Sequence, residues 1–365
     1  MLQHLTLNGV FANPSSIQHC FGEAAESVVE SARDQIAEFL NCKSKDLIFT
    51  SGATESNNLA IKGIAYSYLS LGNHIITSAI EHKSILDTCK FLESNGFHVT
   101  YLRPNADGLI SIDAVSDAIT DKTILVSIMH VNNETGTIQD IEAISRLLEE
   151  KNILFHVDAT QSIGKLPIDL SNSPIDLLSL SAHKIHGPKG IGCLYIRDRH
   201  KIKLTPLMHG GGQENRLRPS TLPTHQIAGM AMAFALAKQG MTRDYQHAKQ
   251  LRIQLLKFLS SLEGVRLNGD QNHILPNIIN LSFDNVSADS LIIALRDNIA
   301  IASGSACNTG AIEASHVLRG MGIEGDRLYG AVRISFGRYA TEEEIEKAGK
   351  RICEEVNRLR QLALE

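Results

Sequence analysis

The chain has 365 residues, of which 43% are apolar and 21% are charged, and these proportions are ordinary for a globular protein. A chain of this length exceeds one typical hydrophobic core, so we expect one large and one smaller domain. The formal net charge of −5 supplies no basic field and argues against stable nucleic-acid binding by charge alone.

The cellular setting is indicated by what the sequence does not contain. No apolar run reaches the length of a membrane helix, and the first residues lack the charged start and long apolar run of a signal peptide. The cysteines are scattered singly, without a Cys-x-x-Cys pair, at positions 20, 42, 89, 193, 307 and 353. This usage predicts reduced thiols in a cytoplasm, with at most one thiol that takes part in chemistry.

Strand and helix patterns alternate along the first part of the chain. An amphipathic pattern first predicts a helix over 22–40. Strands are then expected at 47–50, 74–78, 98–102, 124–129, 153–157, 175–180 and 193–197, with helices at 57–70, 84–94 and 141–151. Strand–helix–strand units of this length predict a mostly parallel sheet with helices on both faces.

The last third predicts a second, smaller α/β unit. A long helical region at about 224–262 leads into it, and a helix follows at 341–362, where Thr341 and Glu344 form a capping box. The strands expected in this unit lie at 278–283, 299–302 and 332–336.

A single lysine follows the apolar strand expected at 175–180. Lys184 lies on a short connection before Gly187-Pro188-Lys189-Gly190, a turn that cannot continue a regular element. Open α/β sheets place their ligands at such strand ends. A desolvated lysine there can lose its proton and form a Schiff base. The alternative is an ordinary surface-loop lysine.

The connection between the strand 47–50 and the next helix reads Ser51-Gly52-Ala53-Thr54-Glu55-Ser56. Backbone amides at a helix start, here around Ala53 and Thr54, can hold a phosphate group together with small hydroxyl side chains. No Gly-Lys-Ser/Thr follows, so this stretch is not a Walker loop. The alternative is a simple helix cap.

Three further polar side chains follow strands of the same sheet. Asp158 ends an apolar strand, and its carboxylate could pair with a protonated ring nitrogen, as a pyridoxal phosphate site requires. His82 could stack on an aromatic cofactor or move protons, and Asn133 also follows a strand end. The alternative for Asp158 is an N-cap. Together with the phosphate-type turn and Lys184, however, these side chains form a chemically complementary set at one edge of the sheet.

Two candidates lie in the last third of the chain. Cys307 stands in the run 302–310, whose small residues cannot bury a thiol, and this exposure favours a reactive over a structural cysteine. Arg333 lies within an apolar strand and requires an anionic partner, which could be a substrate carboxylate or a structural Asp or Glu.

Long stretches of the sequence are similar to one known family. In order they read TSGATESNNLAIKG, HIITSAIEHKSIL, ILVSIMHVNNETG, FHVDATQSIGKLPIDL, SAHKIHGPKGIG, MHGGGQENRLRPSTLP and SGSACNTG. On these motifs the chain resembles the NifS/IscS-type cysteine desulfurases of the class V aminotransferases. The resemblance implies the fold type I of pyridoxal-phosphate-dependent transferases. That fold has a mostly parallel seven-stranded sheet in a large domain and a smaller α/β C-terminal domain.

The resemblance also implies how a cofactor is held. Lys184 would bind pyridoxal 5′-phosphate as a Schiff base, with Asp158 at the ring nitrogen and His82 stacked on the ring and counted among the catalytic residues. Gln161 would bond the phenolic oxygen. The residues expected around the phosphate are Ala53, Thr54, Ser181, His183 and, across a dimer interface, Thr221.

Substrate roles follow from the same resemblance. Asn133 and Arg333 would bind the carboxylate of L-cysteine, and Cys307 would accept the sulfur as a persulfide and deliver it. Two motifs depart from the family pattern, because Pro219 stands in RPST and the cysteine loop reads SACNTG.

The resemblance further suggests domain limits. Residues 1–20 are expected to form an N-terminal loop without the family's opening strand, and 21–45 to contribute to the small domain. Residues 46–240 would form the large cofactor-binding domain, and 241–365 the small domain that carries Cys307.

The predicted function is that of a cytoplasmic, homodimeric cysteine desulfurase that depends on pyridoxal 5′-phosphate. It would pass sulfur to acceptor proteins for iron–sulfur cluster assembly, tRNA thiolation or DNA phosphorothioation, with no direct nucleic-acid or membrane binding. One alternative is a selenocysteine lyase or another β-lyase with the same cofactor. Another is a weakly active scaffold for sulfur-accepting partners. A metalloenzyme is the weakest alternative, because no His-Glu-x-x-His or paired cysteine spacing occurs.

Overall fold

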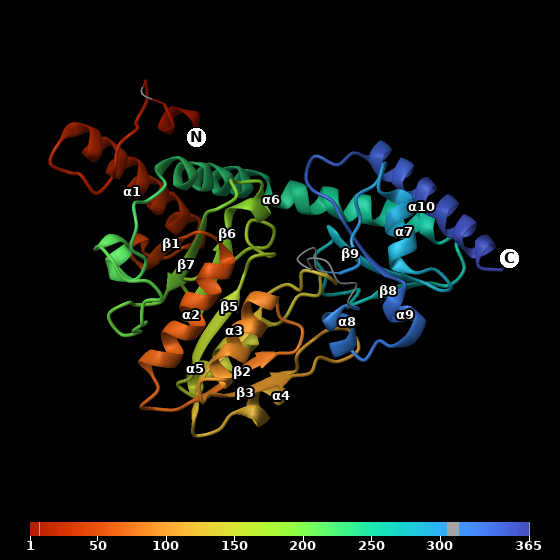
Figure 1. Cartoon of the computed structure of the whole chain (residues 1–365), viewed down its shortest axis with the longest axis horizontal. Coiled ribbons are helices and arrows are strands. Elements are labelled where there is room, and N and C mark those ends of the chain that lie inside the picture. Colours follow the sequence, from red (N-terminus) through yellow and green to blue (C-terminus); the bar gives the residue numbers. More distant parts are fainter. Residues whose placement is uncertain (7, 305–313, 365) are drawn as a thin grey trace.

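The computed structural model describes residues 1–6, 8–304 and 314–364, so Cys307 lies outside the described residues. Two units make up this part of the chain, and one long helix joins them (Figure 1). In the described part of the chain, no helix is both long and apolar enough to cross a membrane.

The larger unit is built on a seven-stranded sheet with the strand order β1-β7-β6-β5-β4-β2-β3. Only β7 runs antiparallel to its neighbours, so the predicted mostly parallel sheet is confirmed. The strands are β1 (Leu47–Thr50), β2 (His74–Ser78), β3 (His98–Leu102), β4 (Thr123–Met129), β5 (Leu154–Asp158), β6 (Leu177–Ser181) and β7 (Gly192–Ile196).

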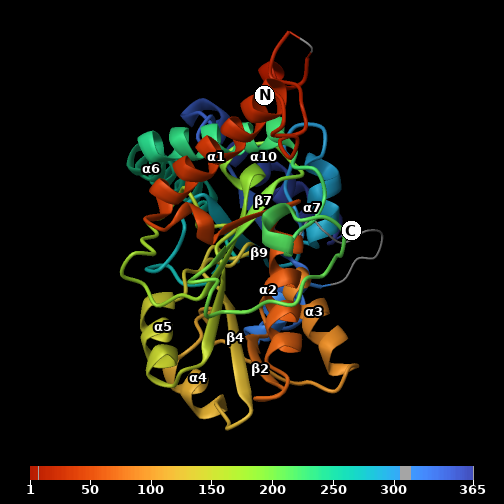
Figure 2. The same cartoon turned by 90° about the vertical axis from the view of Figure 1, so that its left-hand side faces the viewer.

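Helices cover both faces of this sheet, as Figure 2 shows. On one face α2 (Ala53–Ser67) and α3 (Lys83–Glu93) pack on β1, β2, β4, β6 and β7 through a continuous apolar cluster. The other face is covered by α1 (Cys20–Leu40), α4 (Ile112–Ala118), α5 (Ile141–Glu150) and the first half of α6. The central strands are buried on both faces, which explains why they read as apolar runs and not as alternating patterns.

The placement of helix α1 differs from the sequence-based expectation. Residues 21–45 were expected to contribute to the small domain, but Val29, Ile36 and Leu40 of α1 belong to the core cluster that includes β1 and β5 of the large sheet. The amphipathic pattern showed that this helix buries one face, but it did not identify the surface that the face meets.

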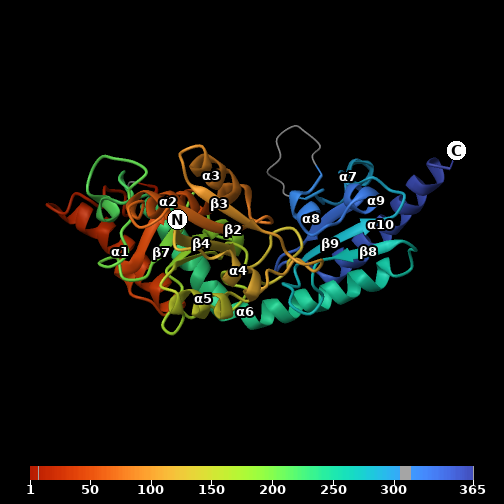
Figure 3. The ribbon, with the colours of Figure 1, turned by 90° about the horizontal axis from the view of Figure 1, so that it is seen from below.

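Helix α6 (Thr224–Leu259) connects the two units (Figure 3). Its 36 residues correspond to a length of about 54 Å. Ile227 and Phe234 in its first half pack into the core of the large unit, whereas Leu251 and Leu255 pack into the small one. The domain limit expected at 240 therefore falls inside a helix that both units share.

The smaller unit has a three-stranded antiparallel sheet with the order β10-β9-β8. Its strands are β8 (Val265–Asn268), β9 (Ile278–Phe283) and β10 (Ala331–Ser335), and its helices are α7 (Ala288–Leu295), α8 (His316–Gly320), α9 (Gly325–Tyr329) and α10 (Glu342–Leu362). The capping box of Thr341 and Glu344 is present at the start of α10, as predicted.

The strand expected at 299–302 is wrong, and β8 was missed. Only Ala302 pairs with β10, through a single bridge in which Ala302 N donates to Arg333 O at 3.1 Å. β8 pairs with β9, and its more polar sequence Val-Arg-Leu-Asn gave a weaker signal.

Candidate active site

A cavity of about 500 Å³ opens at the carboxyl ends of the large-sheet strands. The strand register aligns these ends, because Met129 of β4 pairs with Asp158 of β5, and Asp158 pairs with Ser179 of β6. Among the residues that line the cavity are the predicted Ala53, Thr54, His82, Asn133, Asp158, Gln161, His183, Lys184 and Arg333. The structure therefore brings together residues that are up to 280 positions apart in sequence.

Lys184 reaches this cavity because the chain leaves β6 in a tight turn. The 3-10 helix η3 (Ala182–Ile185) follows the strand and is closed by His186, which has a left-handed backbone with φ 63°. Gly190 also requires a positive φ, of 78°, which explains the Gly-Pro-Lys-Gly signal in the sequence. The turn holds Lys184 at the end of the strand.

Ser181 and His183 flank this turn on its strand side. Ser181 is fully buried and does not line the cavity, but its Oγ lies 2.8 Å from His183 Nδ1. Burial and the nearby charge of Lys184 lower the pKa of His183. A neutral imidazole is therefore expected at this edge of the cavity.

Asp158 is a buried carboxylate with an ordered set of donors. Its Oδ2 accepts a hydrogen bond from Asn57 Nδ2 at 2.9 Å, and its Oδ1 accepts one from the backbone N–H of Thr160 at 2.9 Å. Asn57 comes from α2, so the first helix after the phosphate-type turn also orients the carboxylate at the end of β5. This fixed carboxylate is suited to hold a positive N–H group of a ligand.

The same hydrogen-bond network orients His82. Asn57 Nδ2 also donates to Ser84 Oγ at 2.9 Å, and this oxygen lies 2.9 Å from His82 Nδ1. The backbone N–H of Ser84 donates to the same Nδ1 at 3.1 Å, so the ring proton of neutral His82 belongs on Nε2. Burial lowers the pKa of His82, against the opposing effect of Asp158, and keeps the imidazole neutral near pH 7.

A second buried histidine supports the strand below Asp158. His156 lies between the hydroxyl groups of Ser127 and Ser179, at 2.8 and 2.9 Å from its two ring nitrogens. Complete burial lowers its pKa to about 4, so it stays uncharged. His156 lies two residues before Asp158 on the same face of β5. It bonds the two serine hydroxyl groups there and adds no charge near Asp158.

The phosphate-type turn has the geometry that its sequence indicated. Gly52 has φ 153°, which favours glycine, and α2 begins directly after it at Ala53. Glu55 accepts hydrogen bonds from Ser51 N at 2.6 Å and from Arg218 Nε at 3.0 Å. Burial alone would raise the pKa of Glu55, but these two donors lower it on balance. The start of α2 thus faces the cavity with its backbone N–H groups.

Arg333 extends from the small unit into the cavity of the large unit. It lies on β10, and its Nη1 donates to the backbone oxygen of Asn133 at 3.1 Å. Both residues line the cavity, so the guanidinium group and the amide of Asn133 lie at the junction of the two units.

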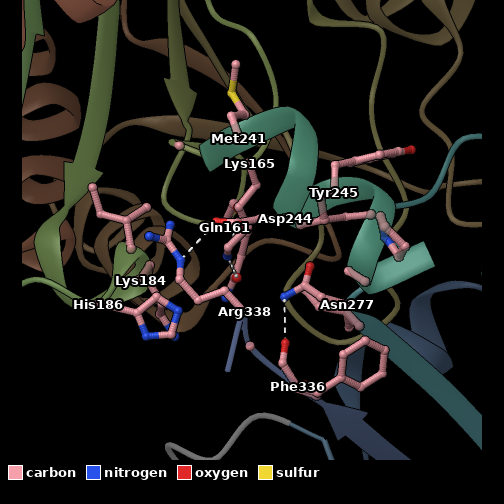
Figure 4. A pocket seen from close by; sticks show the side chains of 18 of the residues that line it. Gln161, Lys165, Lys184, His186, Met241, Asp244, Tyr245, Asn277, Phe336 and Arg338 are labelled. Atoms are coloured by element: carbon pink, nitrogen blue, oxygen red, sulfur yellow. Dashed lines mark hydrogen bonds and ion pairs between the residues drawn. The ribbon is translucent and has the colours of Figure 1, made fainter. Parts of the chain in front are cut away.

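A second cavity, of about 260 Å³, continues from the first past Lys184 and Gln161 (Figure 4). Lys165 Nζ donates there to the backbone oxygen of Gln161 at 3.0 Å and to its Oε1 at 3.4 Å. Because Lys165 engages the amide oxygen, the amide nitrogen of Gln161 is the group left to donate to a ligand. Burial, together with the charge of Lys184, lowers the pKa of Lys165 to about 7.

Thr221 lies apart from the other predicted residues in the described part of the chain. It is exposed and does not line the cavity of its own chain. The segment before it is firmly held, because the buried Glu214 pairs with Arg33 at 2.7 Å and accepts from Phe49 N at 2.7 Å. Cys307 lies outside the described residues.

Sequence reasoning missed Glu81, which precedes His82 and is fully buried. Its Oε1 accepts from Ser78 Oγ at 2.6 Å and from Met129 N at 2.9 Å, while its Oε2 has no hydrogen-bond partner among the described residues. Burial, with a further contribution from the charge of Asp158, raises the pKa of Glu81 to about 8. A neutral carboxyl therefore ties β2 to β4 beside the cavity.

The free energy of unfolding should fall with rising pH because of the Glu81 carboxyl group. Glu81 ionises near pH 4.5 when unfolded and near pH 8 when folded, so between these values the native state binds one more proton than the unfolded state. The free energy of unfolding should lose up to about 1.4 kcal/mol per pH unit across this window. Glu81→Gln keeps an acceptor oxygen but cannot ionise. Denaturation curves recorded at several pH values should therefore show that its free energy of unfolding falls less steeply with rising pH. Parallel pH profiles of the two proteins would mean that Glu81 is charged in the folded state.

Comparisons with known proteins agree with this geometry. A family model described as Aminotransferase class-V matches residues 3–348. The chain is 52% identical to a cysteine desulfurase IscS of Vibrio vulnificus over 363 residues, covering 100% of this chain and 90% of the relative. It is 50% identical to a cysteine desulfurase IscS of Proteus mirabilis with the same coverage.

Solved structures extend the similarity to the fold. A NifS-like protein superimposes with a TM-score of 0.91 at 36% identity, over 98% of this chain and 94% of the other. SspA in complex with cysteine gives a TM-score of 0.81 at 42% identity, over 91% and 92% of the two chains. DndA from Streptomyces lividans gives 0.78 at 41%, over 88% and 90%. The chain therefore belongs to the class-V aminotransferase family and, within it, to the cysteine desulfurases of the NifS/IscS type.

Proposed function

We propose that this protein is a pyridoxal-phosphate-dependent cysteine desulfurase that converts L-cysteine to L-alanine and leaves the sulfur on Cys307 as a persulfide. The observation that carries this proposal is the convergence of Lys184, Asp158 and Arg333 on one cavity. An amine, a buried carboxylate and a guanidinium group are the three functions that an amino-acid substrate and a pyridinium cofactor require.

The residues of the cavity fit pyridoxal 5′-phosphate in charge and shape. The start of α2 can accept the phosphate, and Asp158 can accept the hydrogen bond of a protonated ring nitrogen. Thr160 Oγ1 is buried without a hydrogen-bond partner in the described part of the chain, which is expected where a polar ligand belongs. Lys184 would hold the cofactor through its amine, His82 would cover the ring, and Gln161 would donate to the phenolic oxygen.

When bound, this cofactor supplies an electron sink for bonds at the substrate's α-carbon. The residues of the chain do the remaining work. Arg333 and Asn133 would hold the substrate carboxylate, which fixes the α-carbon near Lys184. Lys184 would move the α-proton, and Asp158 would keep the proton on the ring nitrogen. His82, neutral at pH 7, can donate only from Nε2, which suits it to protonate or orient a neighbouring group.

Cys307 completes the overall reaction. Its thiolate would attack the sulfur of the bound substrate, so that the carbon–sulfur bond breaks as a sulfur–sulfur bond forms. The balance is one L-cysteine and one thiol giving one L-alanine and one persulfide, with no external oxidant or reductant. That a solved relative is named as SspA in complex with cysteine supports L-cysteine as the substrate class. We further infer a cytoplasmic homodimer that passes sulfur to acceptor proteins.

An assay of the purified, cofactor-loaded protein tests the proposal. L-Cysteine in the presence of a thiol reductant should yield alanine and sulfide in equal amounts, and alkylation followed by mass spectrometry should find a persulfide on Cys307. Turnover of selenocysteine without turnover of cysteine would instead identify a selenocysteine lyase. Cofactor binding without turnover of either substrate would favour a scaffold.

A further inference from the structure

One buried carboxylate that the mechanism above does not use lies beside Gly304 and Ser315, the described residues on either side of 305–313. Glu134 directly follows Asn133 in the sequence, and it is 1% exposed. Its Oε2 accepts a hydrogen bond from Ser315 Oγ at 2.5 Å. The burial of a carboxylate is costly unless strong donors compensate for it, and the hydrogen bond from Ser315 offsets part of this cost.

The backbone of Glu134 is fixed from the cavity side. Its N–H donates to Asn132 Oδ1 at 2.9 Å, and Asn132 Nδ2 donates in turn to Ile80 O at 3.0 Å, close to His82. The carbonyl of Asn133, one residue earlier, accepts from Arg333 Nη1. The backbone at Glu134 is therefore held by Asn132, directly beside Asn133 in the wall of the proposed active site.

Both described flanks of residues 305–313 meet this carboxylate. On the C-terminal side, Ser315 donates to it and also caps helix α8 by accepting from Leu318 N at 3.2 Å. On the N-terminal side, Gly304 has φ 143°, and a Cβ added to it would lie 3.2 Å from Glu134 Oε2. The positive φ and this tight approach to the carboxylate both favour glycine at this position.

Two more contacts tie the flanks to the cavity. Ala302 exchanges backbone hydrogen bonds with Arg333, and His316 Nε2 lies 2.9 Å from the backbone oxygen of Glu81, the residue before His82. Cys307 follows Gly304 by three residues, and three residues of chain span at most about 11 Å. The position of Gly304 thus limits the positions that the Cys307 thiol can reach.

We propose that Glu134 is a positioning residue for sulfur transfer: it accepts a hydrogen bond from Ser315 and lies close to Gly304, the two described flanks of residues 305–313, and so limits the reach of Cys307 toward the substrate sulfur. The inference deepens the proposed function and rests on it. Glu134 does not line the cavity of about 500 Å³, so its loss should slow the transfer to Cys307 and spare the earlier steps.

The test uses the cofactor-loaded full chain with Glu134→Ala, Glu134→Gln and Ser315→Ala. Rapid mixing with L-cysteine reports the early change in the cofactor spectrum, and quenched samples analysed by mass spectrometry report the persulfide on Cys307. Glu134→Ala should slow persulfide formation at least about tenfold, which is about 1.4 kcal/mol in activation free energy, while the rate of the spectral change stays within about twofold. Glu134→Gln, which keeps an acceptor oxygen, should have a smaller effect.

Ser315→Ala also removes the cap of α8, so it needs a matched control. Ser287 caps the neighbouring helix α7 through the same kind of bond and has no contact with Glu134, so Ser287→Ala should transfer sulfur at the parent rate. Because Glu134 and Ser315 act on each other, Glu134→Ala/Ser315→Ala should be little slower than either single variant.

The outcomes separate this inference from the proposed function. A parent protein that forms no persulfide would defeat the proposed function itself. A parent that forms it, with Glu134→Ala and Ser315→Ala forming it equally fast, would defeat only the positioning role. The positioning role would also be overturned if all three variants lost cofactor content, the early spectral change and the persulfide to the same extent. A general structural role predicts that pattern.

Discussion

Lys184→Ala should abolish alanine formation while the protein still binds its cofactor. The expected loss is about 10³-fold or more, because a positioned acid–base group contributes about 10² to 10⁴ and Lys184 would also be the point of attachment. Binding should survive through the start of α2 and through Asp158, whose donors Asn57 and Thr160 do not depend on Lys184. Rapid mixing with L-cysteine, an alanine assay and the cofactor content after desalting measure these three properties.

The experiment must distinguish Lys184 from a second lysine nearby, Lys165. Lys165 lies in the adjoining cavity, with its pKa lowered to about 7, and is therefore a second amine that could attach the cofactor. Borohydride reduction of the parent protein followed by peptide mapping should label Lys184 and leave Lys165 unlabelled. Lys165→Ala is the matched control: it should keep the label and most of the turnover, and it tests the support that Lys165 gives to Gln161. Label on Lys165 would transfer the role to that residue, and full turnover in Lys184→Ala would show that Lys184 is not the catalytic lysine.

The sequence predicted the parts of this fold that depend on local pattern. The strands 74–78, 98–102 and 278–283 have the predicted limits because each is a buried or half-buried run bounded by turn residues. Lys184 and Asp158 were found because polar side chains at the ends of parallel strands meet at one sheet edge. These inferences needed no knowledge of which helix packs on which face.

The features that were missed depend on tertiary contacts. Asn57 looks like any polar residue of a helix, yet it donates to Ser84 and to Asp158, which is 101 positions away in sequence. Glu81 differs from a surface glutamate only in being enclosed by β2 and β4. The segment 299–302 has strand-like composition, but only Ala302 pairs with the sheet, through one bridge to β10. Burial and the identity of the contacting residue decide the role of each of these segments, and a local sequence pattern shows neither.

Cys307→Ala should separate the two halves of the proposed chemistry. Substrate binding would use Asn133 and Arg333, and proton movement would use Lys184, and all three line the cavity. The variant should therefore bind the cofactor fully and show the parent's early spectral change when L-cysteine is added.

The later half should fail in the same variant, because no thiolate is present to accept the sulfur. We expect no persulfide on the protein and an alanine rate reduced at least about a hundredfold, or about 2.7 kcal/mol in activation free energy. Cys20→Ala is a suitable control, since Cys20 is an exposed free thiol at the start of α1, and it should keep the parent rate. Rapid-mixing spectra, persulfide detection by mass spectrometry and alanine release are measured on all three proteins. If Cys307→Ala releases alanine as fast as the parent, sulfur leaves without an acceptor thiol, and a β-lyase that discharges sulfur directly becomes the better description of this enzyme.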